Sequence, residues 1–165
     1  MLGAVLLTAE TKPEKPEAID QVRQALRTHA SRVLVFGPGG EGEADRIPLP
    51  PTVSLLGGLA TILASAGTQY CIVAAADLRH PSSELLRYLL YVRGSFDAIV
   101  PERADGSLQP LFALYHPRCL GRARSLVAAG EHDPLRMLES LHVRRVSADE
   151  VAKFGSPDDL LARGA

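Results

Sequence analysis

The chain has 165 residues, of which 46% are hydrophobic and 22% charged, and this length suits one domain with its own core, so we expect residues 1–165 to form a single domain. A formal net charge of -1 gives no electrostatic reason to expect a nucleic acid or an anionic membrane as a partner. No stretch approaches the ~18 consecutive apolar residues of a transmembrane helix, and the first residues lack the basic start of a signal peptide.

The first half of the chain alternates between predicted strands and helices. We expect strands at 3–8 and 32–36, a helix with Pro16 in its first turn, and a second helix capped by Ser54. The glycine-, proline- and acid-rich stretch 37–51 is expected to be a surface loop. Its glycines are not followed by the lysine of a phosphate-binding loop, and its carboxylates would repel phosphate, so we assign it no ligand.

A continuous apolar run at 71–76 ends on a carboxylate, Asp77. Continuous rather than alternating hydrophobicity is typical of a strand that is covered on both faces, as in a parallel sheet between helix layers. Ligands of such sheets collect at the carboxyl ends of the strands, which favours a functional Asp77. An aspartate in this place can equally cap the next turn, so both interpretations stay open. Cys71 in this strand and Cys119 in a predicted helix are expected to be free thiols of a cytoplasmic protein.

The second half continues the alternation. We expect a helix at 82–92, a strand at 96–100, a hairpin turn at Asp105-Gly106 and a strand at 109–115, where Pro110 marks an edge or a bulge. Helices at 118–129 and 133–141, a strand at 143–146 and a helical turn at 157–160 follow. This order predicts an α/β fold: a three-layer α/β/α sandwich around a mostly parallel, Rossmann-like sheet.

Two adjacent glycines stand in the first turn of the helix that Ser54 caps, and glycine weakens a helix there. Close approach of a ligand to the backbone around Gly58 would explain them, since the first N–H groups of a helix are unpaired. Tight packing of this helix on the sheet explains them equally well. Both explanations remain at this point.

Several segments, in order along the chain, resemble the molybdenum cofactor guanylyltransferases. The most specific is Gln109-Pro110-Leu111-Phe112-Ala113-Leu114-Tyr115, which is similar to a Gln-Pro-Leu and Ala-Leu-Tyr segment of that family. Leu56, Gly58 and Leu59 match its Gly-Pro-Leu-x-Gly-Leu segment, and the run into Asp77 resembles its strand ending in Cys-Asp. The stretch 154–160 resembles the family's ending, Phe-x-Asn-x-Asn-Thr-Pro-Glu-Asp-Leu.

The resemblance implies a fold of the nucleoside-diphosphate-sugar transferase type and a transfer of GMP from GTP to a molybdopterin-type acceptor, assisted by Mg²⁺. It implies that Asp77 holds the metal and that Leu56 and Gly58 contact the nucleotide. Gln109 and Pro110 would lie toward the acceptor. A carboxylate that holds Mg²⁺ at a strand end suits phosphoryl chemistry, which depends mainly on positioning and charge neutralisation.

The chain departs from the family pattern after its first strand. The family has a glycine-rich loop with arginine and lysine there, whereas residues 8–16 contain no glycine and no arginine. Lys12 and Lys15 are the candidate replacements that could reach a phosphate, and Arg79 and His80 could add positive charge beside Asp77. Two hypotheses follow: a nucleotidyltransferase with a substitute phosphate grip, and a non-catalytic relative that acts as a binding or assembly partner in cofactor biosynthesis.

Overall fold

A computed structural model of the protein describes residues 1–164 and shows one seven-stranded sheet with the order β3-β2-β1-β4-β6-β5-β7. The strands are β1 (Leu2–Leu6), β2 (Arg32–Gly37), β3 (Arg46–Pro48), β4 (Cys71–Ala75), β5 (Ala98–Pro101), β6 (Phe112–Tyr115) and β7 (Val143–Val146). Only β6 runs antiparallel to its neighbours, β4 and β5. The predicted mostly parallel sheet is therefore confirmed.

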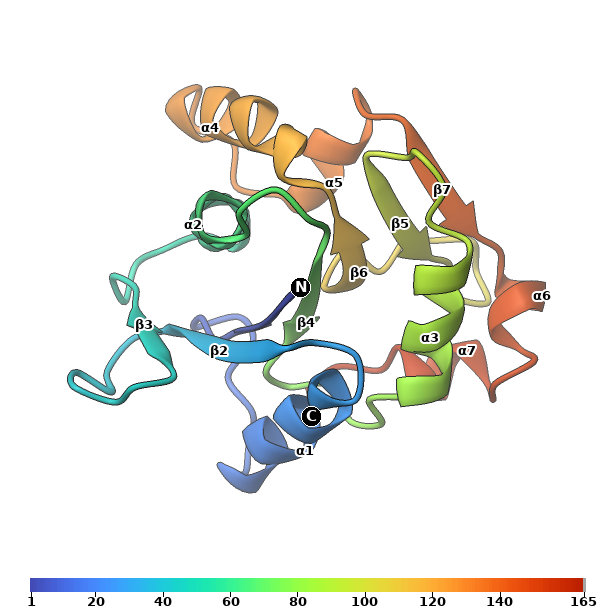
Figure 1. Ribbon diagram of the computed structural model, residues 1–165, viewed down its shortest axis with the longest axis horizontal. Coiled ribbons are helices and arrows are strands. Elements are labelled where there is room, and N and C mark those ends of the chain that lie inside the picture. Colours follow the sequence, from blue (N-terminus) through green and yellow to red (C-terminus); the bar gives the residue numbers. More distant parts are fainter. Residues whose placement is uncertain (165) are drawn as a thin grey trace.

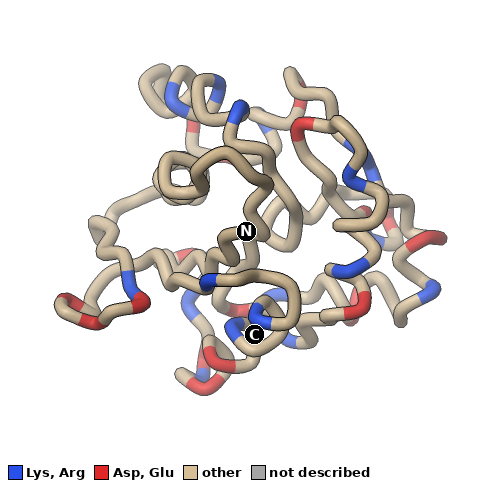
Figure 2. The backbone as a smooth tube through the Cα atoms, viewed as in Figure 1, with Lys and Arg blue, Asp and Glu red and all other residues tan. Residues whose placement is uncertain are grey.

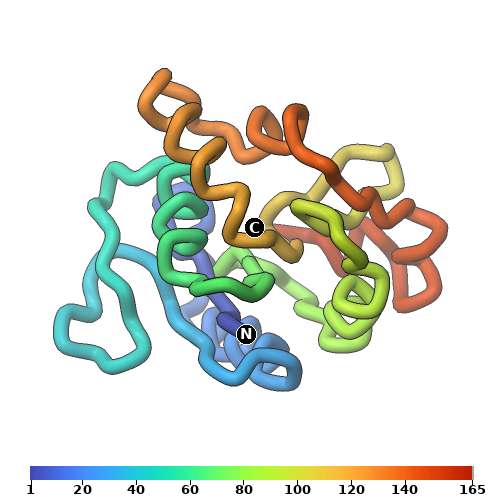
Figure 3. Tube along the Cα trace, turned by 45° about the horizontal axis from the view of Figure 1, so that its top comes forward, coloured from blue at the N-terminus to red at the C-terminus, as the bar shows by residue number. Residues whose placement is uncertain are grey.

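Helices cover both faces of the sheet, as the three-layer prediction requires. The helices are α1 (Glu17–Arg27), α2 (Leu55–Ser65), α3 (Ser83–Tyr91), α4 (Leu120–Ala128), α5 (Pro134–Leu138), α6 (Ala148–Val151) and α7 (Pro157–Leu160), with a 3₁₀ turn, η1 (Pro117–Cys119), before α4. In Figure 1, α1 and α3 lie on one side of the sheet and α2, α4 and α5 on the other. Figures 1 and 3 both place α4 beside α2.

Helices α2 and α5 begin at the predicted capping residues, and α2 ends before the predicted glycine. The Ser54 hydroxyl accepts a hydrogen bond from the Gly57 N–H at 3.0 Å, which satisfies one of the unpaired donors in the first turn of α2. Gly67 follows the end of α2 with a φ of +70°, a conformation that glycine adopts without steric cost. Asp133 caps α5 in the same way as Ser54 caps α2, with Pro134 in the first turn.

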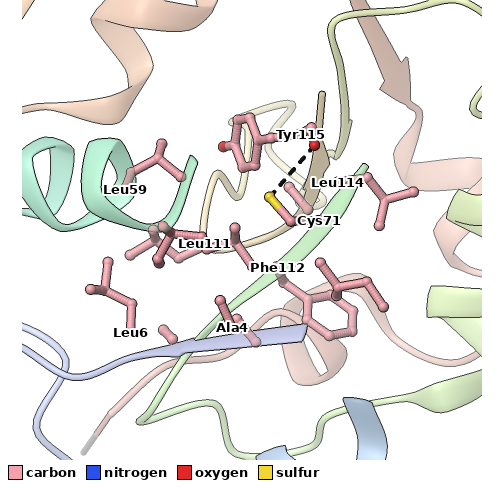
Figure 4. Packing of buried hydrophobic residues seen from close by; sticks show 14 of the residues in the cluster. Ala4, Leu6, Leu59, Cys71, Leu111, Phe112, Leu114 and Tyr115 are labelled. Carbon is pink, nitrogen blue, oxygen red and sulfur yellow. Dashed lines mark hydrogen bonds between the residues drawn. The ribbon is translucent and has the colours of Figure 1, made fainter. Parts of the chain in front are cut away.

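The core consists of the inner strands and the apolar faces of the helices. All five residues of β4 are fully buried, as the continuous apolar run predicts. Figure 4 shows Ala4, Leu6 and Leu59 on the side of the sheet that faces α2. Charged residues are absent from β1, β4, β5, β6 and α2, so the tube in Figure 2 runs tan through these elements. Within residues 1–164, no helix is both long and apolar enough to cross a membrane.

Both cysteines are buried free thiols, as predicted, while the cytoplasmic location stays a prediction. The Cys71 thiol donates to the Tyr115 carbonyl at 3.5 Å, a contact drawn in Figure 4. Burial disfavours the charged thiolate and raises the pKa of each thiol to about 12. Neither thiol is therefore a nucleophile at neutral pH.

The structure differs from the predicted elements in several places. The expected loop 37–51 contains β3, a three-residue edge strand that pairs with β2. Helix α6 was not predicted, although Ser147 and Glu150 form a capping box at its start. The strand expected at 109–115 begins at Phe112 and lies inside the sheet, so the edge alternative for Pro110 is wrong. Pairing with the chain around β5 resumes only at Leu108, opposite Glu102, so Pro110 lies in an interruption of the ladder, as the bulge alternative expects.

Candidate functional site

Three predicted site segments meet at one edge of the sheet. In the parallel pair β1 and β4, Leu6 lies opposite Ala75. The loop that follows β1 and the segment with Asp77 that follows β4 therefore lie side by side at the end of the sheet. Because β6 is antiparallel, its beginning lies at this same edge, and the Ala75 N–H donates to the Leu111 carbonyl at 2.8 Å. This brings the Gln109 segment next to Asp77. Carboxyl edges of this kind are where ligands bind in α/β sheets.

Asp77 is 6% exposed, and both of its carboxylate oxygens are occupied by one arginine. The Arg163 Nε donates to Oδ1 at 3.0 Å, and the Arg163 Nη2 donates to Oδ2 at 3.3 Å. The same Nη2 also donates to the Glu10 carbonyl in the loop after β1, at 2.8 Å. One guanidinium therefore links Asp77 to the loop that replaces the family's glycine-rich loop.

The backbone around Arg163 runs along the residues that follow β4. We call residues 161–164 the closing segment. The Gly164 N–H donates to the Asp77 carbonyl at 2.8 Å, and the Arg79 N–H donates to the Ala162 carbonyl at 3.1 Å. The Arg79 side chain in turn donates to the Gly164 carbonyl. These contacts make an antiparallel bridge between Leu78 and Arg163.

Gln109 is 2% exposed and also holds the closing segment. Its Nε2 donates to the Leu161 carbonyl at 2.9 Å, while its Oε1 accepts from the Leu111 N–H at 3.3 Å. The Pro110 carbonyl accepts from the Tyr115 hydroxyl at 2.6 Å. Both polar ends of the Gln109 amide are thus used inside the protein, and its assignment to an acceptor stays a prediction.

The loop after β1 is held by two buried threonines. The Thr11 hydroxyl donates to the Leu6 carbonyl at 2.8 Å and accepts from the Thr8 N–H at 2.7 Å. The Thr8 hydroxyl accepts from the Glu10 N–H at 3.2 Å. Side-chain bonds of this type give the backbone a closed turn without glycine. This turn stands where the family's phosphate-holding loop would be.

The two candidate lysines lie in different places. Lys15 borders a cavity of about 270 Å³ whose lining also includes Asp77, Arg79 and Gly164. Both lysines are exposed, but Lys12 is not among the residues that line this cavity. The structure therefore brings Lys15, but not Lys12, to the same cavity as Asp77. His80 lies in a neighbouring groove that shares Arg79.

Leu56 and Gly58 lie in the buried first turn of α2. The Leu56 N–H donates to the His132 carbonyl at 3.1 Å, so this donor is already used. A Cβ added at Gly58 would lie 2.6 Å from the Leu6 Cδ1. Close packing of α2 on β1 therefore accounts for Gly58, and the contact of these two residues with a nucleotide stays a prediction.

In this conformation the residues present do not fit a divalent metal. Among residues 1–164, no group of three His, Cys, Asp or Glu side chains lies close enough together to hold an ion. Mg²⁺ is usually held by one or two carboxylates and by substrate phosphates, but both oxygens of Asp77 accept hydrogen bonds from Arg163. The assignment of a metal to Asp77 stays a prediction.

Sequence reasoning missed Arg163 and the two threonines of the first loop. Arg163 lies 86 residues from Asp77 along the chain, and no local pattern signals a contact at that separation. The pair Thr8 and Thr11 carried a weak signal, because Ser and Thr spaced this way often form hydrogen-bonded turns.

Comparison with known proteins decides the family. A family model described as "MobA-like NTP transferase domain" matches residues 14–146, most of the chain. The chain belongs to this family. The match leaves out β1 and most of the loop that follows it. This loop is the part of the chain that departs from the guanylyltransferase pattern.

The relatives of this MobA-like domain agree with that assignment. A protein of Natronomonas pharaonis named "Probable molybdenum cofactor guanylyltransferase" is 34% identical over 117 residues, which is 68% of this chain. The chain spans about half, 54%, of the length of that relative.

Two solved structures share the fold of the MobA-like domain. A protein of Aquifex aeolicus superimposes with a TM-score of 0.81 at 16% identity, over 99% of this chain and 92% of that one. Molybdopterin-guanine dinucleotide biosynthesis protein A from Archaeoglobus fulgidus superimposes with a TM-score of 0.70 at 21% identity, over 97% and 95%.

Proposed function

We propose that this MobA-like domain binds a nucleoside triphosphate, GTP, at the carboxyl edge of β1 and β4 and transfers GMP to a molybdopterin-type acceptor. The observation that carries the proposal is the shared cavity of Lys15 and Asp77, a cation and a carboxylate at the edge where ligands of α/β sheets bind. The family match and the name of the Natronomonas relative support the choice of reaction.

In the proposed transfer, a phosphate oxygen of the acceptor forms a bond to the α-phosphorus of GTP, the bond to the bridging oxygen breaks, and pyrophosphate leaves. The protein contributes mainly position and charge in such a reaction. Lys15 would neutralise phosphate charge from the loop before α1, and Arg79 would do so from the other side of the same cavity. Mg²⁺, the cofactor that the family resemblance implies, would neutralise further phosphate charge of the nucleotide if it were bound at Asp77.

One observation favours a second candidate function, a non-catalytic relative that binds a partner in cofactor biosynthesis. The turn built on Thr8 and Thr11 offers no run of glycine N–H groups to a triphosphate, and Arg163 already pairs with Asp77. We place either activity in the cytoplasm, where both buried thiols would stay reduced.

Calorimetry separates the two candidates. GTP and CTP are titrated, with and without Mg²⁺, into the wild-type protein and into Asp77→Ala. The proposal predicts that GTP binds with Mg²⁺ and that Asp77→Ala loses this binding while its circular dichroism spectrum is unchanged. No binding at millimolar nucleotide would contradict the enzyme and favour the binding partner.

Glu102→Ala is a matched control for Asp77→Ala. Glu102 is also an acidic residue directly after a strand, and it also pairs with an arginine, Arg145, at 2.7 Å. It does not line the cavity of Lys15 and Asp77. Equal loss of GTP binding in both variants would show that the effect of Asp77→Ala comes from a lost ion pair rather than from the site.

A further inference from the structure

We propose that the Arg163 guanidinium takes the place of a metal ion at Asp77, so that the site binds its nucleotide without a divalent cation. The proposal rests on the proposed function, because it concerns the same site and the same nucleotide. It departs from the Mg²⁺ that the family resemblance implies. The positive charge that a metal ion would bring is instead built into the chain.

One guanidinium contacts three oxygen atoms from two chain segments, as a bound cation would. Arg163 donates to Asp77 Oδ1 at 3.0 Å and to Asp77 Oδ2 at 3.3 Å, and its Nη2 also donates to the Glu10 carbonyl at 2.8 Å. Carboxylate and carbonyl oxygens are the ligands that Mg²⁺ prefers, and here all three accept hydrogen bonds from Arg163. Because arginine keeps its proton at any physiological pH, this cation is always present.

The backbone on both sides of Arg163 is held by hydrogen bonds. The Leu161 carbonyl accepts from the Gln109 Nε2 at 2.9 Å, and the Gly164 N–H donates to the Asp77 carbonyl at 2.8 Å. The Leu161 side chain is fully buried in the core. The guanidinium is therefore fixed on the carboxylate before any ligand binds, and a charge that is already in position stabilises an anion without a further cost of ordering.

The charges around the cavity of Lys15 and Asp77 favour an anion because Arg163 is present. Among the described residues, those that line this cavity carry two positive charges, on Lys15 and Arg79, and two carboxylates, on Glu14 and Asp77. Arg163 is not one of the lining residues, but its ion pair neutralises Asp77 and leaves an excess of positive charge. An excess of fixed positive charge attracts phosphate groups without the help of an ion.

A divalent ion and a metal-free nucleotide would meet this site in different ways. The ion would have to displace Arg163 and break its charged hydrogen bonds to Asp77, a carboxylate that is almost fully buried. The phosphates of a metal-free nucleotide would meet Lys15 and Arg79 while the pair of Arg163 and Asp77 stays intact. The site therefore favours the metal-free nucleotide, and the closing segment stays in place when it binds.

The test measures the Kd of a fluorescent GTP analogue in excess EDTA and in saturating Mg²⁺, for the wild type and for Arg163→Met. We expect the wild type to have the same Kd in both conditions. In EDTA the Kd of Arg163→Met should be about tenfold higher, because the unpaired Asp77 carboxylate would repel phosphate. Mg²⁺ should lower the Kd of this variant but not that of the wild type, because only the variant leaves the oxygens of Asp77 open to a cation.

Two further variants separate the charge of Arg163 from general damage to the fold. Arg163→Lys keeps a positive charge and should bind the analogue more tightly in EDTA than Arg163→Met does. Arg144→Met is the matched control, because Arg144 also donates two hydrogen bonds to a carboxylate, that of Glu150, and does not line the cavity. Its Kd should equal that of the wild type in both conditions.

A measurement without nucleotide tests the metal directly. Electron paramagnetic resonance follows the signal of free Mn²⁺ while the wild-type protein is added. We expect no loss of this signal. Binding of Mn²⁺ by the wild type would overturn the inference whatever the nucleotide does.

The possible results separate failure of the inference from failure of the proposed function. Wild-type binding of the analogue that requires Mg²⁺ would overturn the inference and leave the proposed function intact. The inference would also be wrong if Arg163→Met had the wild-type Kd in EDTA, if Mg²⁺ did not lower the Kd of this variant, or if Arg144→Met lost affinity equally. No binding by any variant in either condition would contradict the proposed function and, with it, the inference.

Discussion

Replacing Glu150 with glutamine should destabilise the protein at neutral pH and much less in acid. The Glu150 carboxylate accepts from Arg144 Nη2 at 2.7 Å, from the Tyr88 hydroxyl at 2.6 Å and from the Ser147 N–H at 2.9 Å. These bonds tie α3, β7 and α6 together at the far end of the sheet. The hydrogen bonds from Arg144, more than any other contact, lower the pKa of Glu150 from 4.5 to about 2, although burial acts in the opposite direction.

The size of the effect follows from this shift. A folded-state pKa below the unfolded value means that ionised Glu150 stabilises the folded protein above pH 4.5, and that this stabilisation is lost as the pH falls toward 2. At 1.36 kcal/mol for each pKa unit, the contribution at pH 7 is about 3 kcal/mol. At pH 3 the unfolded chain is already protonated at this site. The difference in the free energy of unfolding between the wild type and Glu150→Gln should therefore be about 2 kcal/mol smaller at pH 3 than at pH 7.

The assay is urea unfolding, followed by circular dichroism, of the wild type and Glu150→Gln at pH 7 and pH 3. Glu139→Gln is the control, because Glu139 pairs with Arg136 at 3.0 Å on the surface, with its side chain 62% exposed, and such pairs contribute less than about 1 kcal/mol. The reasoning would be refuted if the free energies of unfolding of the wild type and Glu150→Gln differed by the same amount at both pH values. That result would mean that the Glu150 side chain stabilises the protein by packing, which does not depend on its protonation.

Three further substitutions test the site from the structural side. Gly58→Ala should cost about 1–3 kcal/mol in urea unfolding, because the new methyl group would lie 2.6 Å from the Cδ1 of the buried Leu6, and either this side chain or α2 would have to shift; no loss would show that the packing there is not tight. Thr11→Val should cost about 1–3 kcal/mol, because the first loop loses its bond to the Leu6 carbonyl, and a stability equal to the wild type would contradict this support. Gln109→Leu removes the donor to the Leu161 carbonyl, so protease cleavage of the closing segment should speed up several-fold; an unchanged cleavage rate would show that Gln109 does not hold it.

Local sequence patterns determined most of the fold. The apolar run of β4, the caps at Ser54 and Asp133, and the stop at Gly67 were each predicted from neighbouring residues, and each has the predicted role in the structure. The reason is that hydrophobic periodicity, capping and turn preference all act within a few residues. The family could also be inferred, because the segment around Gln109 carries enough residues in a fixed order to be specific, and the family model confirms it.

Which residues contact one another in the candidate site was decided by tertiary structure alone. Asp77 stands at the strand end where the sequence places it, but its partner Arg163 comes from 86 residues further along the chain. Likewise β3 forms where its backbone pairs with the edge of β2, and Gly58 is explained by the position of the Leu6 side chain. Contacts of this kind depend on how separate elements pack, and no short stretch of sequence encodes which arginine reaches which carboxylate.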